Sequence, residues 1–290
     1  MSSKSAIDNR RDAFLGLIGV KPVIMGVLNV TPDSFSDGGR FQSLAPALAQ
    51  ARKLVADGAD IIDVGAESTR PSATPVPLAE EWRRLEPVLA PLLAEVAAPF
   101  SIDTYKAEIA RRAVALGVSV INDVWGLQKD PAMADVAAET GAALVIMHNR
   151  ESIDPDLDIR SDLWRFFDRS LHLADGAGIK RSRILLDPGI GFGKTRAQNL
   201  RALALTGALR EAFGLPILIG VSRKRLMSEP SGGAGVDEEL AGTLAANLAA
   251  LARGASVFRV HDAAEHAAAF EVFEAIERVG RLTPIPRPSR

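Results

Sequence analysis

Two cationic side chains lie at the end of a short apolar run near the C-terminus. Val257–Val260 carries Arg259, and His261 follows directly. Side chains two residues apart on a β-strand share a face, so we expect Arg259 and His261 to project to the same side. Arginine offers a planar fork of donors, and a histidine beside it adds another. This combination suits a phosphate or diphosphate group.

A denser group of cations follows a second apolar run, in the stretch ILIGVSRKRLM that begins at Ile217. The same alternation groups Ser222 with Lys224. It turns Arg223 and Arg225 to the opposite side, where they are expected to be structural or solvated. The stretch therefore predicts one hydroxyl and one ammonium directed at a common ligand.

Acidic and amide side chains end three other apolar runs, namely Asp103, Asn122 and Asp187. A buried carboxylate is costly unless it is paired. A flat heterocycle with several N–H donors would pair these groups, and the asparagine offers both a donor and an acceptor. Lys224 would balance their charge and contact the ring face. The alternative is a set of internal salt bridges that binds no ligand.

Further candidates lie in two long turn-rich segments, residues 31–39 and 67–75. Their glycines, prolines and small polar residues favour mobile lids. Phe35 in the first segment is either an exposed anchor or a cover for an aromatic substrate. His148, at the end of another apolar run, is either a structural hydrogen-bonding residue or part of the site.

Two kinds of segment alternate along the chain, and together they would position these residues. Eight Val- and Ile-rich runs are typical of buried parallel strands: Val23–Val30, Asp60–Gly65, Phe100–Asp103, Val118–Asp123, Ala143–His148, Ile184–Asp187, Ile217–Val221 and Val257–Val260. Ala- and Leu-rich stretches with helical charge spacing follow them, near 45–57, 78–97, 105–116, 131–139, 161–178, 197–213, 237–253 and 262–279. Eight such units favour a single-domain (β/α)8 TIM barrel, in which the strand ends form one rim. A doubly wound sheet is the alternative, but no GxGxxG follows the first run.

Composition limits the class of protein. Hydrophobic residues make up 47% of the 290, which is enough for a sizeable core, and a net charge of −2 gives no basic field for nucleic acid. The absence of cysteine excludes disulfides and thiolate metal sites. Without a signal-peptide core or a membrane-length apolar run, we expect a soluble cytoplasmic protein. Residues 1–20 and 281–290 are predicted to be an N-terminal extension and a C-terminal tail around a barrel of residues 21–280.

Seven segments in order resemble dihydropteroate synthase, the pterin-binding enzyme of the folate pathway. They are MGVLNVTPDSFSDGG, DIIDVGAESTRP, SIDTYK, INDV, LDPGIGFGK, GVSRK and FRVHD, and the match covers about residues 23–279. The resemblance implies a (β/α)8 barrel, usually dimeric. It also implies a transferase that joins 6-hydroxymethyl-7,8-dihydropterin diphosphate to p-aminobenzoate, with Mg2+, and that sulfonamides inhibit. Pyrophosphate and 7,8-dihydropteroate would be the products.

The resemblance also implies roles for individual residues. The pterin would be held by Asp103, Asn122, Asp187 and Lys224. The diphosphate would be held by Asn29, Arg70, Arg259 and His261, with Asn29 also the metal residue near Mg2+. The p-aminobenzoate site would be lined by Phe35, Thr69, Pro71, Phe192 and Ser222, together with Lys224. The catalytic set would be Asp37, in the loop over the reacting centre, with Lys224, Arg259 and His261.

Two other functions use the same pocket. A pterin-dependent methyltransferase shares the barrel and the pterin site but has no need for the Arg259 and His261 pair. A non-catalytic pterin-binding relative is expected to have lost a loop or anion residue, and no such loss is visible in the sequence. Ala66 and Ser72 do depart from the family, because glycine is common at both positions.

Overall fold

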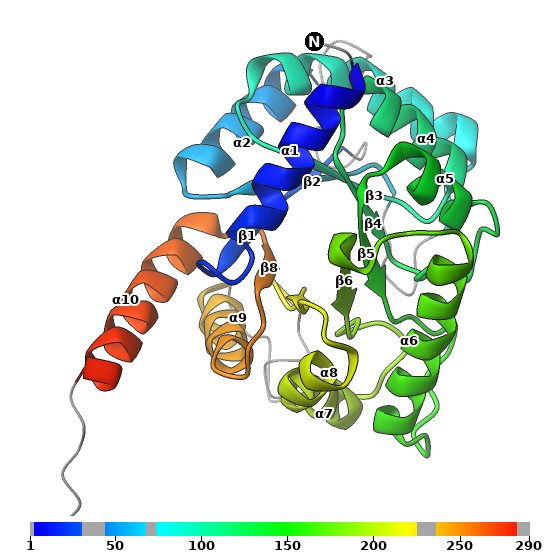
Figure 1. The fold of residues 1–290 in the computed structure, drawn as a ribbon. Helices are drawn as coiled ribbons and strands as arrows, with labels where there is room; N and C mark the ends of the chain where they lie inside the picture. Colours follow the sequence, from blue (N-terminus) through cyan, green and yellow to red (C-terminus); the bar gives the residue numbers. More distant parts are fainter. Residues whose placement is uncertain (1–2, 31–43, 68–73, 225–235, 283–290) are drawn as a thin grey trace, which may run out of the picture.

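The computed structural model describes residues 3–30, 44–67, 74–224 and 236–282. Within these ranges, eight parallel strands form a nearly closed ring with helices outside it (Figure 1). The strands are β1 Val23–Asn29, β2 Ile61–Gly65, β3 Phe100–Asp103, β4 Val120–Asp123, β5 Ala143–Met147, β6 Ile184–Asp187, β7 Leu218–Ile219 and β8 Val257–Val260. They are hydrogen-bonded in the order β6-β5-β4-β3-β2-β1-β8-β7, and a parallel bridge between Leu186 and Ile217 closes the ring. The predicted TIM barrel is confirmed.

Most of the helices connect successive strands and cover the outside of the barrel. They are α1 Ser3–Leu17, α2 Leu44–Ala56, α3 Leu78–Glu95, α4 Ala107–Leu116, α5 Met133–Thr140, α6 Ile159–Gly176, α7 Arg196–Ala204, α8 Thr206–Phe213, α9 Val236–Leu251 and α10 Ala263–Leu282. The single helix predicted over 197–213 is wrong, because the chain turns at Leu205 between α7 and α8. There the hydroxyl of Thr206 donates to the carbonyl of Leu203 at 2.7 Å, so this carbonyl in the last turn of α7 has a hydrogen-bond partner. None of the helices in the described ranges is long and apolar enough to cross a membrane.

Alternation along the strands divides their side chains between the barrel interior and the helices. At the amino ends the interior positions are apolar: Val23, Met25, Ile61, Val120, Ala143, Leu185, Leu218 and Val257 form one buried cluster. Two residues further along four of these strands, the interior positions become polar, at Asp63, Asn122, Asp187 and Arg259. The barrel is therefore closed and apolar at one end and polar at the end where the sequence predicts a site.

The helix α1 closes the apolar end. Phe14 is fully buried among the interior side chains of the strands, with Leu15, Leu17 and Ile18 packed beside it. Arg11 donates to the carbonyl of Gly141 at 2.7 Å, which ties the helix to the turn before β5. The predicted N-terminal extension is thus a helix packed against the barrel.

Because Phe14 fills the closed end, we expect Phe14→Ala to lower the free energy of unfolding by about 3–5 kcal/mol, through lost apolar burial and a residual cavity. Urea denaturation would measure it. Val20→Ala is the control, since Val20 is 75% exposed and its truncation should change stability by less than about 0.5 kcal/mol. Equal effects of the two substitutions would show that α1 does not contribute to the packing of the barrel.

Candidate active site

A partly buried arginine joins two buried acids at the polar end of the barrel. Arg259 on β8 donates from Nε to Asp63 Oδ2 at 2.6 Å and from Nη2 to Asp103 Oδ2 at 2.7 Å. Both carboxylates are almost completely buried. Burial raises the pKa of Asp103 to about 7, and the charge of Arg259 opposes that rise. These ion pairs agree in part with the alternative interpretation of the sequence, in which the acids form internal salt bridges and bind no ligand.

The ion pairs leave acceptors unused. Asn122 on β4 donates from Nδ2 to Asp63 Oδ2 at 3.1 Å. Among the described residues, Asp63 Oδ1, Asp103 Oδ1 and Asn122 Oδ1 are buried and have no hydrogen-bond partner. A buried acceptor without a partner costs free energy unless a ligand donor meets it. The arrangement therefore fits a ligand that presents several N–H groups, as expected for Asp103 and Asn122.

Asp187 and Lys224 lie on the opposite side of the same opening. Asp187 on β6 accepts from the backbone N–H of Gly189 at 2.7 Å, and burial raises its pKa. Burial also lowers the pKa of Lys224 to about 8, although Asp187 opposes this shift. The Lys224 ammonium donates to the carbonyl of Ile190 and lies 4.5 Å from the centre of the Phe192 ring. The predicted neighbours Asp187, Lys224 and Phe192 are thus brought together.

Ser222 and Arg223 form a turn after β7, where the sequence predicted a longer strand. Arg223 has φ +55°, so the chain reverses there and strand alternation does not apply. Its side chain pairs with Asp262 at 2.5 Å, as a structural arginine directed away from Lys224. The predicted orientation is right, but the cause is the turn. Arg225 lies outside the described residues.

His261 and Arg259 have separate contacts. Ser222 Oγ accepts from the backbone N–H of His261 at 3.1 Å, and the His261 ring lies beside it, with Nδ1 3.0 Å away. Arg259 reaches instead across the opening to β2 and β3. Ser222 therefore lies between His261 and the end of β7.

Of the remaining predicted site residues, the structure describes only Asn29. Asn29 is exposed at the carboxyl end of β1, paired in register with Gly65 on β2. Five predicted residues lie outside the described ranges: Phe35, Asp37, Thr69, Arg70 and Pro71. No group of three or more acidic or histidine side chains in the described part of the chain could hold a metal ion by itself.

Sequence reasoning missed Asp63. It is the single charged residue within the apolar stretch IIDVG, at an interior position of β2. A charge in the middle of a fully buried parallel strand is the signal that could have identified it, since such a charge needs a partner. That partner, Arg259, is 196 residues away in the sequence.

A second missed group supports the chain next to the site. Lys106 pairs with both Glu67 and Glu81, and Glu67 also accepts from the Tyr105 hydroxyl and from the backbone N–H of Val76, each at 3.1 Å. These contacts hold residues 67 and 76 together. They therefore fix both flanks of residues 68–73, which carry predicted positions Thr69, Arg70 and Pro71.

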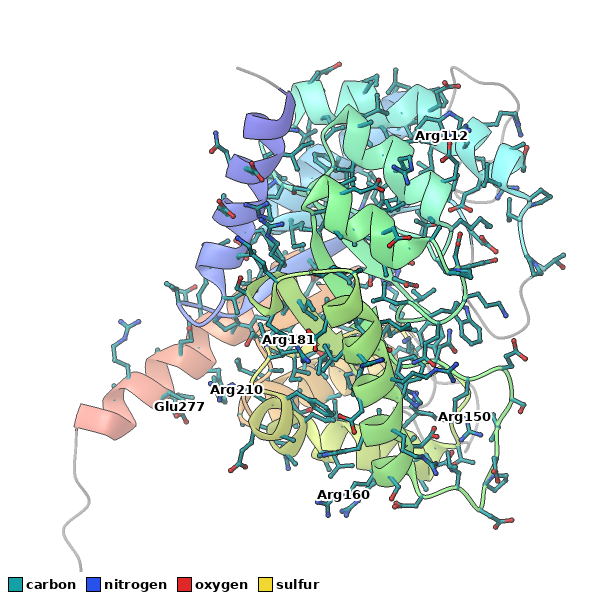
Figure 2. All side chains as sticks on the ribbon, turned by 45° about the vertical axis from the view of Figure 1, so that its right-hand side comes forward. Arg112, Arg150, Arg160, Arg181, Arg210 and Glu277 are labelled. Carbon is teal, nitrogen blue, oxygen red and sulfur yellow. The ribbon has the colours of Figure 1, made fainter. Side chains whose placement is uncertain are left out.

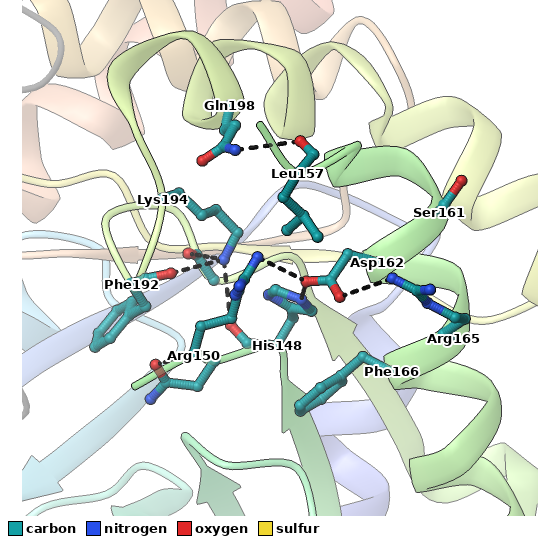
Figure 3. Close-up of polar contacts among 12 residues, drawn as sticks. His148, Arg150, Leu157, Ser161, Asp162, Arg165, Phe166, Phe192, Lys194 and Gln198 are labelled. Carbon is teal, nitrogen blue, oxygen red and sulfur yellow. Dashed lines mark hydrogen bonds and ion pairs between the residues drawn. The ribbon is translucent and has the colours of Figure 1, made fainter. Parts of the chain in front are cut away.

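His148 is a structural residue at the end of β5, close to Asp162 and Phe166 of α6 (Figure 3). It is fully buried, its Nε2 lies 3.1 Å from Asp162 Oδ2, and its ring packs 4.7 Å from that of Phe166. Burial lowers the pKa of His148 to about 4, with Asp162 opposing the shift. The imidazole is therefore neutral near pH 7 and anchors β5 to α6.

The comparison with protein families decides the assignment. A family model described as "Pterin binding enzyme" matches residues 25–261. The chain belongs to this family of pterin binding enzymes. The dihydropteroate synthase of Clostridium beijerinckii is 41% identical over 262 residues, which cover 90% of this chain and 96% of that protein.

Solved structures give the same result. Dihydropteroate synthase from Clostridium difficile, crystallised in the presence of pteroic acid, has a TM-score of 0.85 and 44% identity, covering 90% of this chain and 98% of that one. The enzyme from Xanthomonas albilineans with 4-aminobenzoic acid has a TM-score of 0.83 and 43% identity, covering 89% and 93%. The resemblance seen in the sequence motifs is confirmed.

The low pKa of His148 has a measurable consequence. Between about pH 6.5 and about pH 4 the unfolded chain binds a proton on this ring that the folded chain does not, so stability is lost as the pH falls through this window. We expect His148→Gln to remove up to about 3 kcal/mol of that loss. Urea unfolding at several pH values would measure the difference.

The matched control is His172→Gln, since His172 is exposed on α6. Its stability curve should run parallel to that of the wild type. If the curve of His148→Gln also ran parallel, the imidazole would not be held neutral in the folded protein.

Proposed function

We propose that this protein joins 6-hydroxymethyl-7,8-dihydropterin diphosphate to p-aminobenzoate, forming 7,8-dihydropteroate and releasing pyrophosphate. It is a transferase of the folate pathway. The observation that carries the proposal is the set of buried acceptors without partners, on Asp63, Asp103 and Asn122, at the mouth of a barrel that matches dihydropteroate synthases over about nine-tenths of its length.

The pterin fits the polar end of the barrel. Its pyrimidine ring presents N–H groups along one edge, and Asp103, Asn122 and Asp187 offer acceptors from three strands. Lys224, held close to Asp187 and the Phe192 ring, adds a donor for the ring heteroatoms. The partly buried guanidinium of Arg259 donates to both acids, and its positive charge strengthens these hydrogen bonds.

The diphosphate would meet the cations at the rim. The guanidinium of Arg259 has five N–H donors, and its contacts with Asp63 and Asp103 engage only Nε and Nη2. Donors therefore remain for a phosphate oxygen, with His261 nearby and Arg70 as the expected third cation. Asn29 is exposed at the same rim and, with the diphosphate oxygens, fits Mg2+, which takes few protein ligands. When bound, Mg2+ would neutralise charge on the leaving group.

The second substrate would occupy the space beside Phe192 and Ser222. The ring of Phe192 and the ammonium of Lys224 form one wall. The hydroxyl of Ser222 and its neighbouring backbone can meet a carboxylate. We expect Phe35, Thr69 and Pro71 to complete this site.

The reaction then requires little from the protein beyond position and charge. The methylene that carries the diphosphate is attached to an electron-rich ring, so positive character there is stabilised when the bond to oxygen breaks. Arg259 and His261 stabilise the departing charge, and the second site holds the neutral aryl amine in line. An aryl amine is nucleophilic without a strong base.

The test is an assay of pyrophosphate release by the whole chain, with mass spectrometry of the pterin product. We expect release only when both substrates and Mg2+ are present, together with the mass of 7,8-dihydropteroate. Methyl transfer from a methylated reduced pterin, without pyrophosphate release, would support the methyltransferase alternative. Binding of the pterin without turnover would support a non-catalytic role.

The pterin site can be tested separately. Asp187→Asn keeps the shape of the side chain, and burial already raises the pKa of this group, so we expect the variant to fold. It replaces an acceptor by a donor that meets ligand N–H groups. Affinity for a pterin analogue without diphosphate should fall about 10- to 100-fold, as measured by calorimetry.

Asp175→Asn is the control for that substitution, because Asp175 is a half-exposed acid on α6 paired with Arg181. Its affinity for the analogue should equal that of the wild type. Unchanged affinity in Asp187→Asn as well would leave Asp187 with a structural role only.

We also propose that the protein is a homodimer that uses α10. Val272, Ile276 and Val279 are 60%, 64% and 62% exposed and lie on one face of this helix, at spacings of four and three residues. Figure 1 and Figure 2 show α10, which carries Glu277, extending away from the barrel. An exposed apolar stripe on a projecting helix is suited to pack against a second copy.

Ile276→Glu should therefore shift the protein from dimer to monomer in size-exclusion chromatography with light scattering, since it places a charge in the contact. Ile153→Glu is the matched control, because Ile153 is 58% exposed between β5 and α6. A wild-type monomer, or a variant that remains dimeric, would exclude α10 as the contact.

A further inference from the structure

Lys194 is buried in the loop between β6 and α7. Among the described residues, its side chain forms hydrogen bonds with backbone carbonyl groups. Its residue exposure is 4%. Within the described residues, its ammonium donates to the carbonyl oxygens of Gly189 at 2.8 Å, Phe192 at 3.0 Å and His148 at 3.5 Å (Figure 3). An ammonium has three N–H donors, so these carbonyls match its full capacity.

This arrangement is costly in a way that packing alone does not require. Burial lowers the pKa of Lys194 to about 7, with Asp187 opposing the shift. A methionine side chain would fill the same space without burying a charge. The hydrogen bonds to the three carbonyls are therefore the feature that distinguishes lysine at this position.

The loop needs such a tie because its backbone has unusual freedom. Gly189, Gly191 and Gly193 have φ values of +64°, +88° and +58°. A Cβ on Gly189 would lie 1.8 Å from the carbonyl oxygen of His148, and one on Gly193 would lie 2.5 Å from Arg150 Cβ. The loop is pressed against the end of β5, and three glycines within five residues raise the entropic cost of holding it there.

The same loop carries both contacts that shape the second-substrate wall. Phe192 presents its ring to the Lys224 ammonium, and its own carbonyl accepts from Lys194. Ile190, one residue after Gly189, provides the carbonyl that accepts from Lys224. Lys194 thus holds the backbone on each side of the residues that meet Lys224.

We propose that Lys194 is a positioning residue for the p-aminobenzoate site: it fixes the β6–α7 loop to the end of β5, so that Phe192 and the Ile190 carbonyl stay in place beside Lys224. The proposal rests on the function proposed above. It extends that function, because it relates the hydrogen bonds of Lys194 to the binding of one of the two substrates. The pterin acceptors on β3 and β4 do not depend on this loop. Asp187 and Lys224 do contact it, through Gly189 and Ile190, so we expect a loss for the pterin that is smaller than the loss for p-aminobenzoate.

The test is Lys194→Met in the whole chain, by steady-state kinetics with each substrate varied in turn. We expect the KM for p-aminobenzoate to rise at least about 10-fold, while the affinity for a pterin analogue without diphosphate changes less than about threefold. A residue that served only stability would change the melting temperature and leave the ratio of the two effects near one. Lys53→Met, on the exposed face of α2, is the matched control and should leave both constants unchanged.

A rescue arm keeps the test decisive if Lys194→Met folds poorly. Because the chain contains no cysteine, Lys194→Cys introduces a single thiol. Alkylation with 2-bromoethylamine in denaturant, followed by refolding, places an ammonium on a side chain of lysine length. We expect the KM for p-aminobenzoate to return to within about threefold of wild type taken through the same steps. Alkylation with iodoacetamide, which adds a neutral amide of the same length, should not restore it.

Three results would overturn the proposal. They are an unchanged KM for p-aminobenzoate in Lys194→Met, an equal loss for both substrates, or equal behaviour of the two alkylated proteins. The wild-type assay separates these from failure of the proposed function. If the wild type releases pyrophosphate with both substrates, that function holds whatever the Lys194 variants do.

Discussion

The ion pairs of Arg259 with Asp63 and Asp103 are the interaction on which the polar end of the barrel depends. One guanidinium joins β8 to β2 and β3 and compensates for two carboxylates that are almost completely buried. Burial raises the pKa of Asp103, and the charge of Arg259 opposes that rise. Among the described residues, Asp63 and Asp103 each keep one carboxyl oxygen without a hydrogen-bond partner. The same contact therefore stabilises the fold and prepares acceptors for a ligand.

This arrangement is possible because the barrel interior is divided along its length. Apolar side chains and Phe14 of α1 fill the end where the strands begin, so the carboxyl ends can carry polar groups without loss of the core. Strand alternation brings Asp103, Asn122 and Asp187 to the same interior from three separate strands. A TIM barrel concentrates such residues on one rim, and so a few residues per strand end suffice for a complete site.

Around this rim, the loops are held by groups that do not face the substrates themselves. Lys194 ties the β6–α7 loop to β5, Lys106 joins Glu67 to Glu81, and Arg223 pairs with Asp262 behind the turn that carries Ser222. Each is a cation satisfied by backbone or acidic partners beneath a loop. The inner layer of the site is thus rigid at its base.

The sequence by itself determined the fold class, most of the strand ends and the family, because periodic apolar runs and ordered motifs are local properties of the chain. It also predicted roles for Asp103, Asn122, Asp187, Lys224 and Phe192, which the structure places at the polar end of the barrel. Tertiary structure decided the partners. Asp63 and Arg259 are 196 residues apart, and Asp103 and Arg259 are 156 apart, so no local pattern could pair them. The turn at Arg223, the break between α7 and α8, the burial of Phe14 and the carbonyl contacts of Lys194 likewise depend on neighbours that only folding brings together.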